Sequence, residues 1–386
     1  MSEVVIAGIG QIPVGEHWEL SLRNMAARAI LAARHDAGGI LPDAVYVGNF
    51  LGSTLSHQSN LGSLIVDNTG LENAEGWTVE AADASGAGAF RLGYLAVSSG
   101  YVDAALVVGV EKCTDAAPGE LEAAAVQATD YDYESIQGIT LTSQAALLMQ
   151  RYFYEYDVPR EALGVFPLLA HANGANNPNA FFQKAIRQEA YLNAAEISSP
   201  LNLFDQAPYG DGAAAVILTR PELIKEKLAH PLVRVLGSSV VIDAVSLHDR
   251  HSPLAFKAAG YSVEKACRQA GILPTDADFF ELSDSFSIYA ALSLEAAGFA
   301  ERGTACRVAQ EGAFKLGGRL PIATMGGMKA RGNPFGASGI YQIVETVLQL
   351  RGQAGVNQIA NARLGLVQSL GGPASTAVTH VLERWH

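Results

Sequence analysis

The feature that most constrains the fold of this chain is an internal repeat. The first copy of the repeat consists of Ala84-Ser85-Gly86, a helix-like segment and the apolar run ALVVGVE. The second copy consists of Ala337-Ser338-Gly339, another helix-like segment and the apolar run LGLVQSLGG. A repeated supersecondary unit predicts two similar halves. We place the first half at residues 1–230 and the second at 231–386. Within the first half, an excursion at about 115–211 is too long for a simple connection and is typical of a lid or an oligomerisation loop.

Apolar, β-rich runs alternate with helix-like segments along both halves. Helical spacing is clearest at residues 21–33 and 340–350. The expected strands are 4–7, 44–47, 104–108, 214–218, 232–236, 365–368 and 377–382. Strands that alternate with helices indicate the α/β class, with sheets sandwiched between helices.

Composition excludes several classes of protein. With 386 residues, 49% of them hydrophobic, the chain can bury a large core. A formal net charge of -13 argues against a nucleic-acid surface, because phosphate binding depends on clustered Lys and Arg. Cys113, Cys267 and Cys306 have no CxxC spacing, so neither a disulfide framework nor a metal site is expected. The N-terminal apolar run is too short to span a membrane and lacks a signal peptide's basic region, which favours a cytoplasmic protein.

The segment GWTVEAADASG, residues 76–86, reads as a strand that turns sharply into a helix. Such a turn presents one side chain at a helix N-terminus, where negative charge is stabilised and the pKa of a thiol is lowered. The place suits a cysteine nucleophile, yet the residue is Asp83. Two interpretations follow: a carboxylate that works in a pocket, or a plain helix N-cap, which contributes about 1 kcal/mol.

Six stretches, in this order, carry a family resemblance: EAADASGAGAF, ALVVGVEKCTD, DGAAA, FELSDSFSIYAALSLEAAGF, GGMKARGNPFGASG and GLVQSLGGPAS. Through them the chain resembles the thiolases over almost its whole length, most closely the sterol-carrier-protein-2 type and the archaeal acetyl-CoA acetyltransferase-like members. The resemblance implies the thiolase fold. This fold has two βαβαβαββ halves in a layered α/β/α/β/α arrangement, with a loop domain inserted in the first half.

The resemblance also locates the reactive positions, and all of them are changed. The family's nucleophilic Cys corresponds to Asp83, and the His of its Gly-His-Pro motif corresponds to Asn333. The His and Cys of its His-Asp-Cys-Phe motif correspond to Ser283 and Ser285. In the family, these residues accept the acyl group, activate the thiol, bind the thioester oxygen and shuttle the proton. The four positions form our predicted catalytic site.

The replacements limit the chemistry. A carboxylate is a poor acyl acceptor, because its attack on a thioester gives a mixed anhydride, whereas a thiolate exchanges thioesters at little cost. Asn333 and Ser283 exchange hydrogen bonds but move no proton at neutral pH, and Ser285 has no activating base in its motif. A turn role for Asn333 and a role for the serines in satisfying backbone groups are the alternatives. Because all four positions are polar, we favour a retained hydrogen-bonding pocket without acyl transfer.

The resemblance implies ligand-binding residues as well. Gly371 and Gly372 stand where the family's loop offers backbone N–H groups to an oxyanion, although both glycines could serve only the turn. Lys329 and Arg331, in GGMKARG, are predicted to meet the phosphates of coenzyme A, with solvated surface charge as the alternative.

An enzyme of this kind needs a second acid or base near Asp83 and Asn333. The candidates are Tyr209, Tyr289, Tyr341 and His57, and His248 lies in a similar polar segment. Lys184 and Arg187 lie in the excursion, where thiolases bind coenzyme A.

Two classes of function follow. The first is an enzyme that binds an acyl-CoA thioester, with no further cofactor and no metal, and cleaves a C–C bond by a non-covalent, retro-aldol type of reaction. The second is a catalytically inactive partner subunit, or an acyl-CoA- or lipid-binding protein. Some thiolase relatives that pair with a small OB-fold protein resemble aldolases, so such a partner is expected. The alternating, β-branched segment GWTVEA predicts a strand that pairs with its symmetry mate in a homodimer or higher homo-oligomer.

Overall fold

The computed structural model describes residues 2–225 and 227–385 and places nine strands in one hydrogen-bonded sheet. Their order is β3-β2-β4-β7-β1-β8-β11-β10-β9, in which the first five belong to the first half and the last four to the second. The strands are β1 (Val5–Gln11), β2 (Ala44–Gly48), β3 (Glu75–Val79), β4 (Ala104–Glu111), β7 (Gly212–Thr219), β8 (Val233–Ile242), β9 (Phe279–Glu281), β10 (Leu364–Gly371) and β11 (Thr376–Arg384). Every strand expected from the sequence is present, and β9 is one that was not expected.

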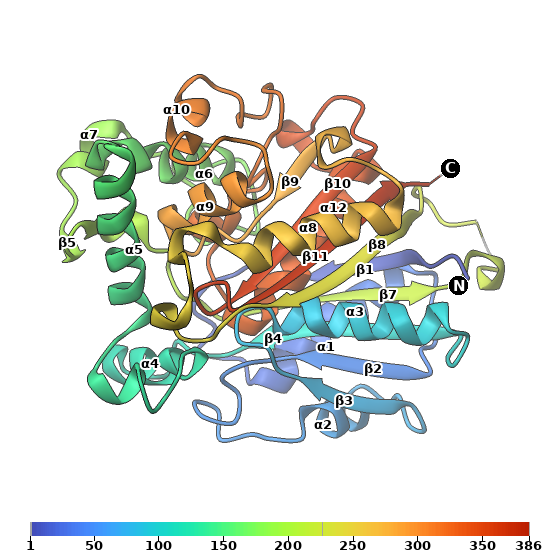
Figure 1. Ribbon diagram of the computed structural model, residues 1–386. Coiled ribbons are helices and arrows are strands. Elements are labelled where there is room, and N and C mark those ends of the chain that lie inside the picture. Colours follow the sequence, from blue (N-terminus) through green and yellow to red (C-terminus); the bar gives the residue numbers. More distant parts are fainter. Residues whose placement is uncertain (1, 226, 386) are drawn as a thin grey trace.

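Among the described strands, the two half-sheets join only through β1 and β8, and helices cover both faces of each half-sheet (Figure 1). The helices α3 and α12 contact strands of both halves and form the middle layer, while α1 and α2 cover the outer face of the first half and α8 that of the second. These helices are α1 (Leu22–Asp36), α2 (Leu61–Asn68), α3 (Ser85–Ser98), α8 (Lys257–Ala270) and α12 (Ser338–Arg351). The predicted five-layer α/β/α/β/α arrangement is confirmed.

Strand β4 shows how the sequence produces this sandwich. All eight of its residues are buried. Ala105 and Val107 pack in the core with α3 and α12, whereas Leu106 and Val108 pack in the core with α1 and α2. A strand buried on both faces reads as a continuous apolar run, which is what ALVVGVE is.

The two halves differ at one edge. The first half runs β1-α1-β2-α2-β3-α3-β4-β7, with β3 at the edge of the sheet. In the second half, among the described residues, the parallel pairing beyond β9 is a single bridge between Phe280 and Ile322. The first half therefore keeps a full edge strand that the second half has reduced to one residue pair.

The repeated Ala-Ser-Gly triplets lie where α3 and α12 meet. A Cβ atom on Gly86 would stand 2.8 Å from the carbonyl oxygen of Gly336, and one on Gly339 would stand 2.5 Å from the backbone nitrogen of Ala87. Real Cβ atoms do not approach backbone so closely, so both glycines are needed for the helix starts to touch. The repeat detected in the sequence is thus the contact that brings the two halves together.

The excursion lies between β4 and β7, at one side of the layered body (Figure 1). Its main elements are α4 (Pro118–Ala125), α5 (Leu141–Tyr156), α6 (Val165–Gly174), α7 (Gln188–Leu192), β5 (Glu196–Ser198) and β6 (Leu201–Asn202). Asp211 lies at the end of the excursion and accepts hydrogen bonds from two backbone N–H groups at the start of the excursion, those of Cys113 (2.7 Å) and Thr114 (2.9 Å). The excursion is thereby closed at its base. The boundary at residues 230 and 231 stays a prediction.

The second half contains three further short helices, which are α9 (Ser287–Ala296), α10 (Ala305–Gln310) and α11 (Gly327–Arg331). Helix α11 packs against α6 of the excursion. Within the described part of the chain, no helix is both long enough and apolar enough to cross a membrane.

Candidate functional site

Asp83 is held in a strained turn between β3 and α3. Ala82, directly before it, has a φ of 51°, a left-handed conformation that is uncommon for a residue with a Cβ atom. The hydroxyl of Ser85 fixes this turn by accepting from the Ala81 N–H (2.9 Å) and donating to the Ala82 carbonyl (2.6 Å). The N-cap of α3 is Ala84, with no side-chain capping bond. The N-cap interpretation of Asp83 is therefore wrong. Backbone strain of this kind clusters at functional sites.

The carboxylate of Asp83 is buried and incompletely hydrogen-bonded. The residue is 7% exposed, and its Oδ1 atom has no hydrogen-bond partner within residues 2–225 and 227–385. Burial raises its pKa to about 6, while the Asn333 side chain and the backbone act in the opposite direction. A carboxylate with this pKa is mostly ionised at neutral pH and can still accept a proton.

Asn333 presents its amide N–H groups toward Asp83. Its Oδ1 atom accepts from the backbone N–H of Phe335 (3.1 Å) and from Ser338 Oγ (2.7 Å). Because a backbone N–H can only donate, these bonds fix which way the amide faces, and Nδ2 is left to donate into the pocket. The turn interpretation and the pocket interpretation of Asn333 both hold, since the turn orients the donor.

Two phenols flank the same space. Tyr209 stacks on Phe335 with ring centroids 4.5 Å apart, and Tyr289 is 2% exposed. Neither hydroxyl has a hydrogen-bond partner among the residues that the structure describes. Burial raises the pKa of both phenols well above the ordinary range of tyrosine. Buried polar groups are rarely left unpaired, so these hydroxyls point to a bound ligand or water.

These groups line one small pocket with a volume of about 10 Å³, which is room for about one water molecule. Its lining residues are Asp83, Leu141, Tyr209, Ser285, Phe286, Tyr289, Asn333, Phe335 and Gly372. Of the sequence-predicted site, Asp83, Asn333, Ser285 and Gly372 therefore come together.

Ser283 and Gly371 lie beside the pocket and do not line it. Ser283 Oγ accepts a hydrogen bond from the Leu370 N–H (3.1 Å) and faces the Gln368 carbonyl (3.4 Å). Ser283 therefore satisfies backbone groups, which was the alternative to a catalytic role for this serine. A Cβ atom on Gly371 would stand 2.4 Å from the Ala81 carbonyl oxygen, so Gly371 allows the turn before Asp83 to pack closely.

The predicted phosphate contacts of Lys329 and Arg331 are not supported, because both side chains are buried. Lys329 Nζ donates to the Asp205 carbonyl (2.7 Å), and burial lowers its pKa to about 8. Arg331 forms a buried ion pair with Glu345 (3.0 Å). The basic, glycine-rich run points inward, where α11 packs against the excursion.

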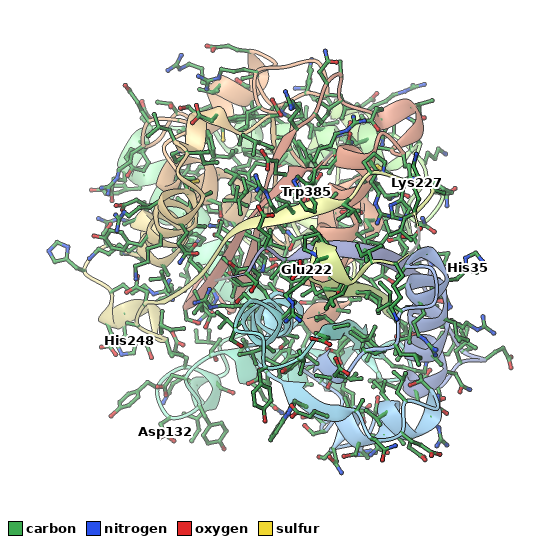
Figure 2. The ribbon with its side chains drawn as sticks, turned by 90° about the vertical axis from the view of Figure 1, so that its right-hand side faces the viewer. His35, Asp132, Glu222, Lys227, His248 and Trp385 are labelled. Carbon is green, nitrogen blue, oxygen red and sulfur yellow. The ribbon has the colours of Figure 1, made fainter. Side chains whose placement is uncertain are left out.

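Three other predicted candidates lie elsewhere. His57 is exposed and does not line the pocket, and His248 lies at the periphery of the molecule beside Asp249 (Figure 2). The Tyr341 hydroxyl is buried against the carbonyl groups of Ile12 (2.7 Å) and Ala213 (3.0 Å). Of the four proposed acids or bases, Tyr209 and Tyr289 line the same pocket as Asp83.

The cysteines offer no reactive thiol. Cys113, Cys267 and Cys306 are all buried and unpaired. Burial raises the pKa of each thiol, to about 11 for Cys267 and to about 12 for Cys306. A thiol with a raised pKa forms little thiolate and is a weak nucleophile. Among the described residues, no group of three or more His, Cys, Asp or Glu side chains is arranged to hold a metal ion.

Sequence reasoning missed two charged residues that support the pocket. Glu111 accepts hydrogen bonds from the Phe50 N–H (2.9 Å) and the Gly336 N–H (3.2 Å), and so ties the Asn333 turn to β4. Arg250 donates to the Pro373 carbonyl (2.6 Å), next to Gly372. Glu111 is the last residue of the apolar run ALVVGVE, where a single charge among apolar residues is a visible signal. Arg250 lies in the same polar segment as His248, and no sequence pattern distinguishes it there.

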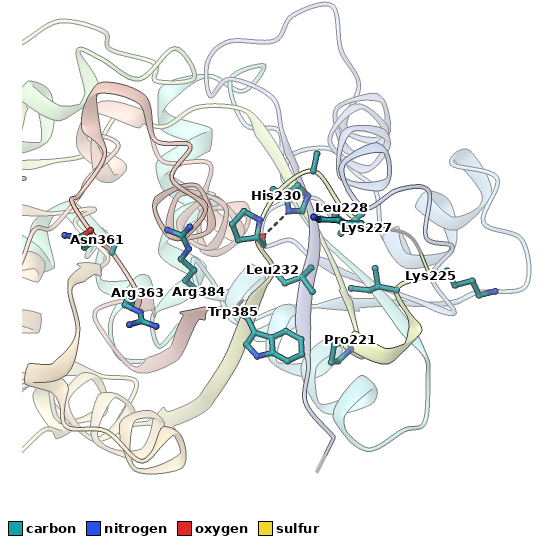
Figure 3. Close-up of a pocket in the computed structure, with 14 residues that line it drawn as sticks. Pro221, Lys225, Lys227, Leu228, His230, Leu232, Asn361, Arg363, Arg384 and Trp385 are labelled. Carbon is teal, nitrogen blue, oxygen red and sulfur yellow. Dashed lines mark hydrogen bonds between the residues drawn. The ribbon is translucent and has the colours of Figure 1, made fainter.

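Larger hollows lie outside this pocket. One of about 690 Å³ is lined by His171, Phe182, Lys184, Arg187 and Phe204, among others. Another, of about 990 Å³, lies between the β7–β8 connection and the end of β11 (Figure 3). Its exposed cations include Lys227, Arg363 and Arg384, and none of the predicted site residues lines it.

Comparison with known proteins places the chain in a family. The model described as "Thiolase, N-terminal domain" matches residues 4–193, and "Thiolase C-terminal domain-like" matches residues 239–384. The chain belongs to the thiolase family. It is 39% identical to the acetyl-CoA acetyltransferase of Methanothermobacter thermautotrophicus, over 100% of both chains.

The chain is also similar to one further sequence relative and, in fold, to a solved structure. The chain is 31% identical to the benzoylsuccinyl-CoA thiolase subunit BbsB of Thauera aromatica, over 91% of this chain and 90% of that protein. Among solved structures, it is similar to the Ltp2-ChsH2(DUF35) aldolase, with a TM-score of 0.86 and 24% identity over 99% of this chain and 98% of that chain. These matches confirm the family and the fold predicted from the sequence.

Proposed function

We propose that this thiolase-family protein cleaves a C–C bond of a β-hydroxyacyl-CoA thioester by a retro-aldol reaction, without an acyl-enzyme intermediate. The observation that carries the proposal is the buried Asp83 carboxylate. It stands where the family has a nucleophilic thiol, has a free Oδ1 atom and a pKa of about 6, and faces the Asn333 amide and two unpaired phenols. A site that had simply collapsed would not keep four polar groups aimed at one space.

Each group has a defined part in this reaction. Asp83 takes the proton of the β-hydroxyl group, the Cα–Cβ bond breaks as the new carbonyl forms, and the electron pair moves to the thioester oxygen as an enolate. Asn333 Nδ2 donates to that oxygen, in the manner of an oxyanion hole. A phenol then supplies the proton that Cα needs. The products are an aldehyde or ketone and a shortened acyl-CoA.

The 690 Å³ hollow supports binding of coenzyme A. Lys184 and Arg187 are cations suited to phosphates, and both line it together with Phe182 and Phe204. The rings of His171 and Phe182 stack with centroids 5.8 Å apart, which offers an aromatic face for a base. The similarity to the Ltp2-ChsH2(DUF35) aldolase supports a lyase with this fold.

The test is incubation of the purified protein with a panel of 3-hydroxyacyl-CoA thioesters. Released aldehyde or ketone is trapped with a hydrazine, and shortened acyl-CoA is measured by mass spectrometry. Asp83→Asn should lower the rate by at least about 100-fold, the usual effect of losing a general base. Asp67→Asn, an exposed carboxylate on α2, is the control and should keep full activity. Product formation that requires free coenzyme A would show thiolysis and contradict the proposal.

Partners form a second part of the proposal. The name of the Ltp2-ChsH2(DUF35) aldolase includes a DUF35 component, and BbsB is named as a subunit. A small OB-fold partner is therefore proposed, either for the active lyase or for an inactive subunit. A homodimer is proposed through β3, whose Trp77 is 60% exposed at the sheet edge, because an exposed apolar edge strand invites pairing.

A further inference from the structure

Arg250 is a buried cation beside the pocket. The residue is 7% exposed, and its guanidinium donates to the carbonyl groups of Pro373 (2.6 Å) and Ala244 (2.9 Å). Among the described residues, no carboxylate lies within ion-pair distance of Arg250. Burial lowers the pKa of its guanidinium, and the charges of Asp243, Tyr289 and Glu134 only partly oppose that lowering. A buried charge without a close counter-ion is costly, so this arginine needs a functional explanation.

Tyr289 lines the pocket together with Gly372, which neighbours the Pro373 carbonyl that Arg250 binds, and its charge and that of Arg250 influence each other. Its ring packs edge-on against Phe256 and Phe286, with centroids 5.5 and 5.0 Å away, so its hydroxyl is aimed by packing. In the described part of the chain, the hydroxyl has no hydrogen-bond partner, and the residue lines the pocket with Asp83. The phenol is therefore available to a molecule bound in the pocket.

The two phenols differ in the charges around them. Tyr209 faces two carboxylates, Glu122 and Asp83, and both disfavour its phenolate. Tyr289 faces Asp83 and Glu134, which also disfavour a phenolate, but it faces Arg250 as well, which favours one. Burial disfavours the phenolate at both positions. Only the phenolate of Tyr289 would gain a cationic neighbour.

We infer that Tyr289 is the proton donor of the pocket and that Arg250 is its positioning residue, which stabilises the phenolate and holds the turn at Gly372. The inference rests on the proposed retro-aldol function. The Tyr289 O–H bond breaks as its proton forms a C–H bond at Cα of the enolate. The phenolate then takes the proton that Asp83 removed from the substrate hydroxyl. Both groups are restored, and no other reactant is consumed.

The charge pairing can be tested without any activity. Difluorotyrosine, whose phenol titrates near neutral pH, is placed at position 289 or at position 209 and followed by ¹⁹F NMR against pH. Arg250→Gln should raise the pKa at position 289 by about one unit or more and leave position 209 unchanged. An unchanged pKa at position 289, or an equal rise at both positions, overturns the inference.

Arg250→Lys separates charge from structure. It keeps the cation but loses the planar fork that reaches both carbonyl groups. If charge is the cause, the pKa at position 289 in Arg250→Lys stays closer to that of the native protein than to that of Arg250→Gln. If Arg250→Lys behaves as Arg250→Gln does, the arginine acts only by holding the turn, and its electrostatic role is refuted. The lysine variant also keeps the test open if Arg250→Gln does not fold.

Kinetics complete the test. With a cleaved 3-hydroxyacyl-CoA, Tyr289→Phe and Arg250→Gln should each lower kcat at least about tenfold with little change in KM, since the lost interaction exists only after proton transfer. Tyr209→Phe should lower kcat less than Tyr289→Phe does. A Tyr289→Phe variant with unchanged kcat overturns the assignment. If no variant and no native sample cleaves any thioester, the proposed function fails, and the ¹⁹F titration alone decides whether Arg250 and Tyr289 are coupled.

Discussion

Replacing the Asp83 carboxylate by an amide should stabilise the protein, and the gain should depend on pH. The folded-state pKa of about 6 is raised from 3.8, so the folded protein holds this proton more tightly than the unfolded chain does. Stability from this group is therefore fully present below pH 3.8 and is lost as the pH rises to about 6. Above that, the buried charge costs about 3 kcal/mol, from a shift of about two units at 1.36 kcal/mol each. Asp83→Asn removes this cost.

The expected size of the effect can be worked out for thermal unfolding. An unfolding entropy of about 2.1 cal/mol/K per residue, over 386 residues, turns 3 kcal/mol into a rise in Tm of about 4 °C at pH 8. At pH 4.5 the same linkage leaves about 1 kcal/mol, or about 1 °C. Differential scanning calorimetry from pH 4.5 to 8 measures both. Asp67→Asn, which is exposed on α2, should shift Tm by less than about 1 °C at every pH.

Two results would refute this reasoning. A Tm difference between Asp83→Asn and native protein that stays constant from pH 4.5 to 8 would mean that the carboxylate is not destabilised by burial. A loss of stability at pH 8 would mean that the carboxylate makes interactions in the folded protein that outweigh its desolvation.

The remaining predictions concern assembly, covalent chemistry and binding. Trp77→Lys at the β3 edge should convert a dimer to a monomer in sedimentation at micromolar concentration, and a native protein that is already monomeric would contradict it. Intact-mass analysis after incubation with labelled acetyl-CoA should show no hydroxylamine-sensitive acyl group. Asp83→Cys alone should show no thiolase activity, because Asn333 cannot draw off the thiol proton and single members of a catalytic unit recover little; detectable thiolysis would refute this. Lys184→Gln with Arg187→Gln should weaken acyl-CoA binding in calorimetry at least about tenfold, and unchanged affinity would remove the 690 Å³ hollow as the coenzyme site.

The fold was predictable because its signals are local. A run such as ALVVGVE predicts a doubly buried strand by composition alone, and the repeat around the Ala-Ser-Gly triplets predicts two similar halves. The positions of Asp83 and Asn333 followed from the family motifs, and each lies shortly before one of the repeated helices, α3 (Ser85–Ser98) or α12 (Ser338–Arg351).

The errors have a common physical cause. The run GGMKARG reads as a flexible, basic surface loop, but Lys329 and Arg331 are buried by partners from distant segments, among them Asp205 and Glu345. Whether a charged side chain faces solvent or a buried partner depends on tertiary packing. A local sequence pattern does not predict that packing. The same holds for Arg250, whose role depends on a turn more than 100 residues away, at Pro373.

The contact between the Ala-Ser-Gly triplets also has a consequence for assembly during folding. Asp83 precedes one triplet and Asn333 precedes the other, and the Gly86 and Gly339 contacts set the spacing between them. Neither half on its own can enclose the acidic pocket. A folding intermediate with one finished half would carry Asp83 with the pKa of an exposed carboxylate, so the proton affinity of this single group would report the moment at which the two halves dock.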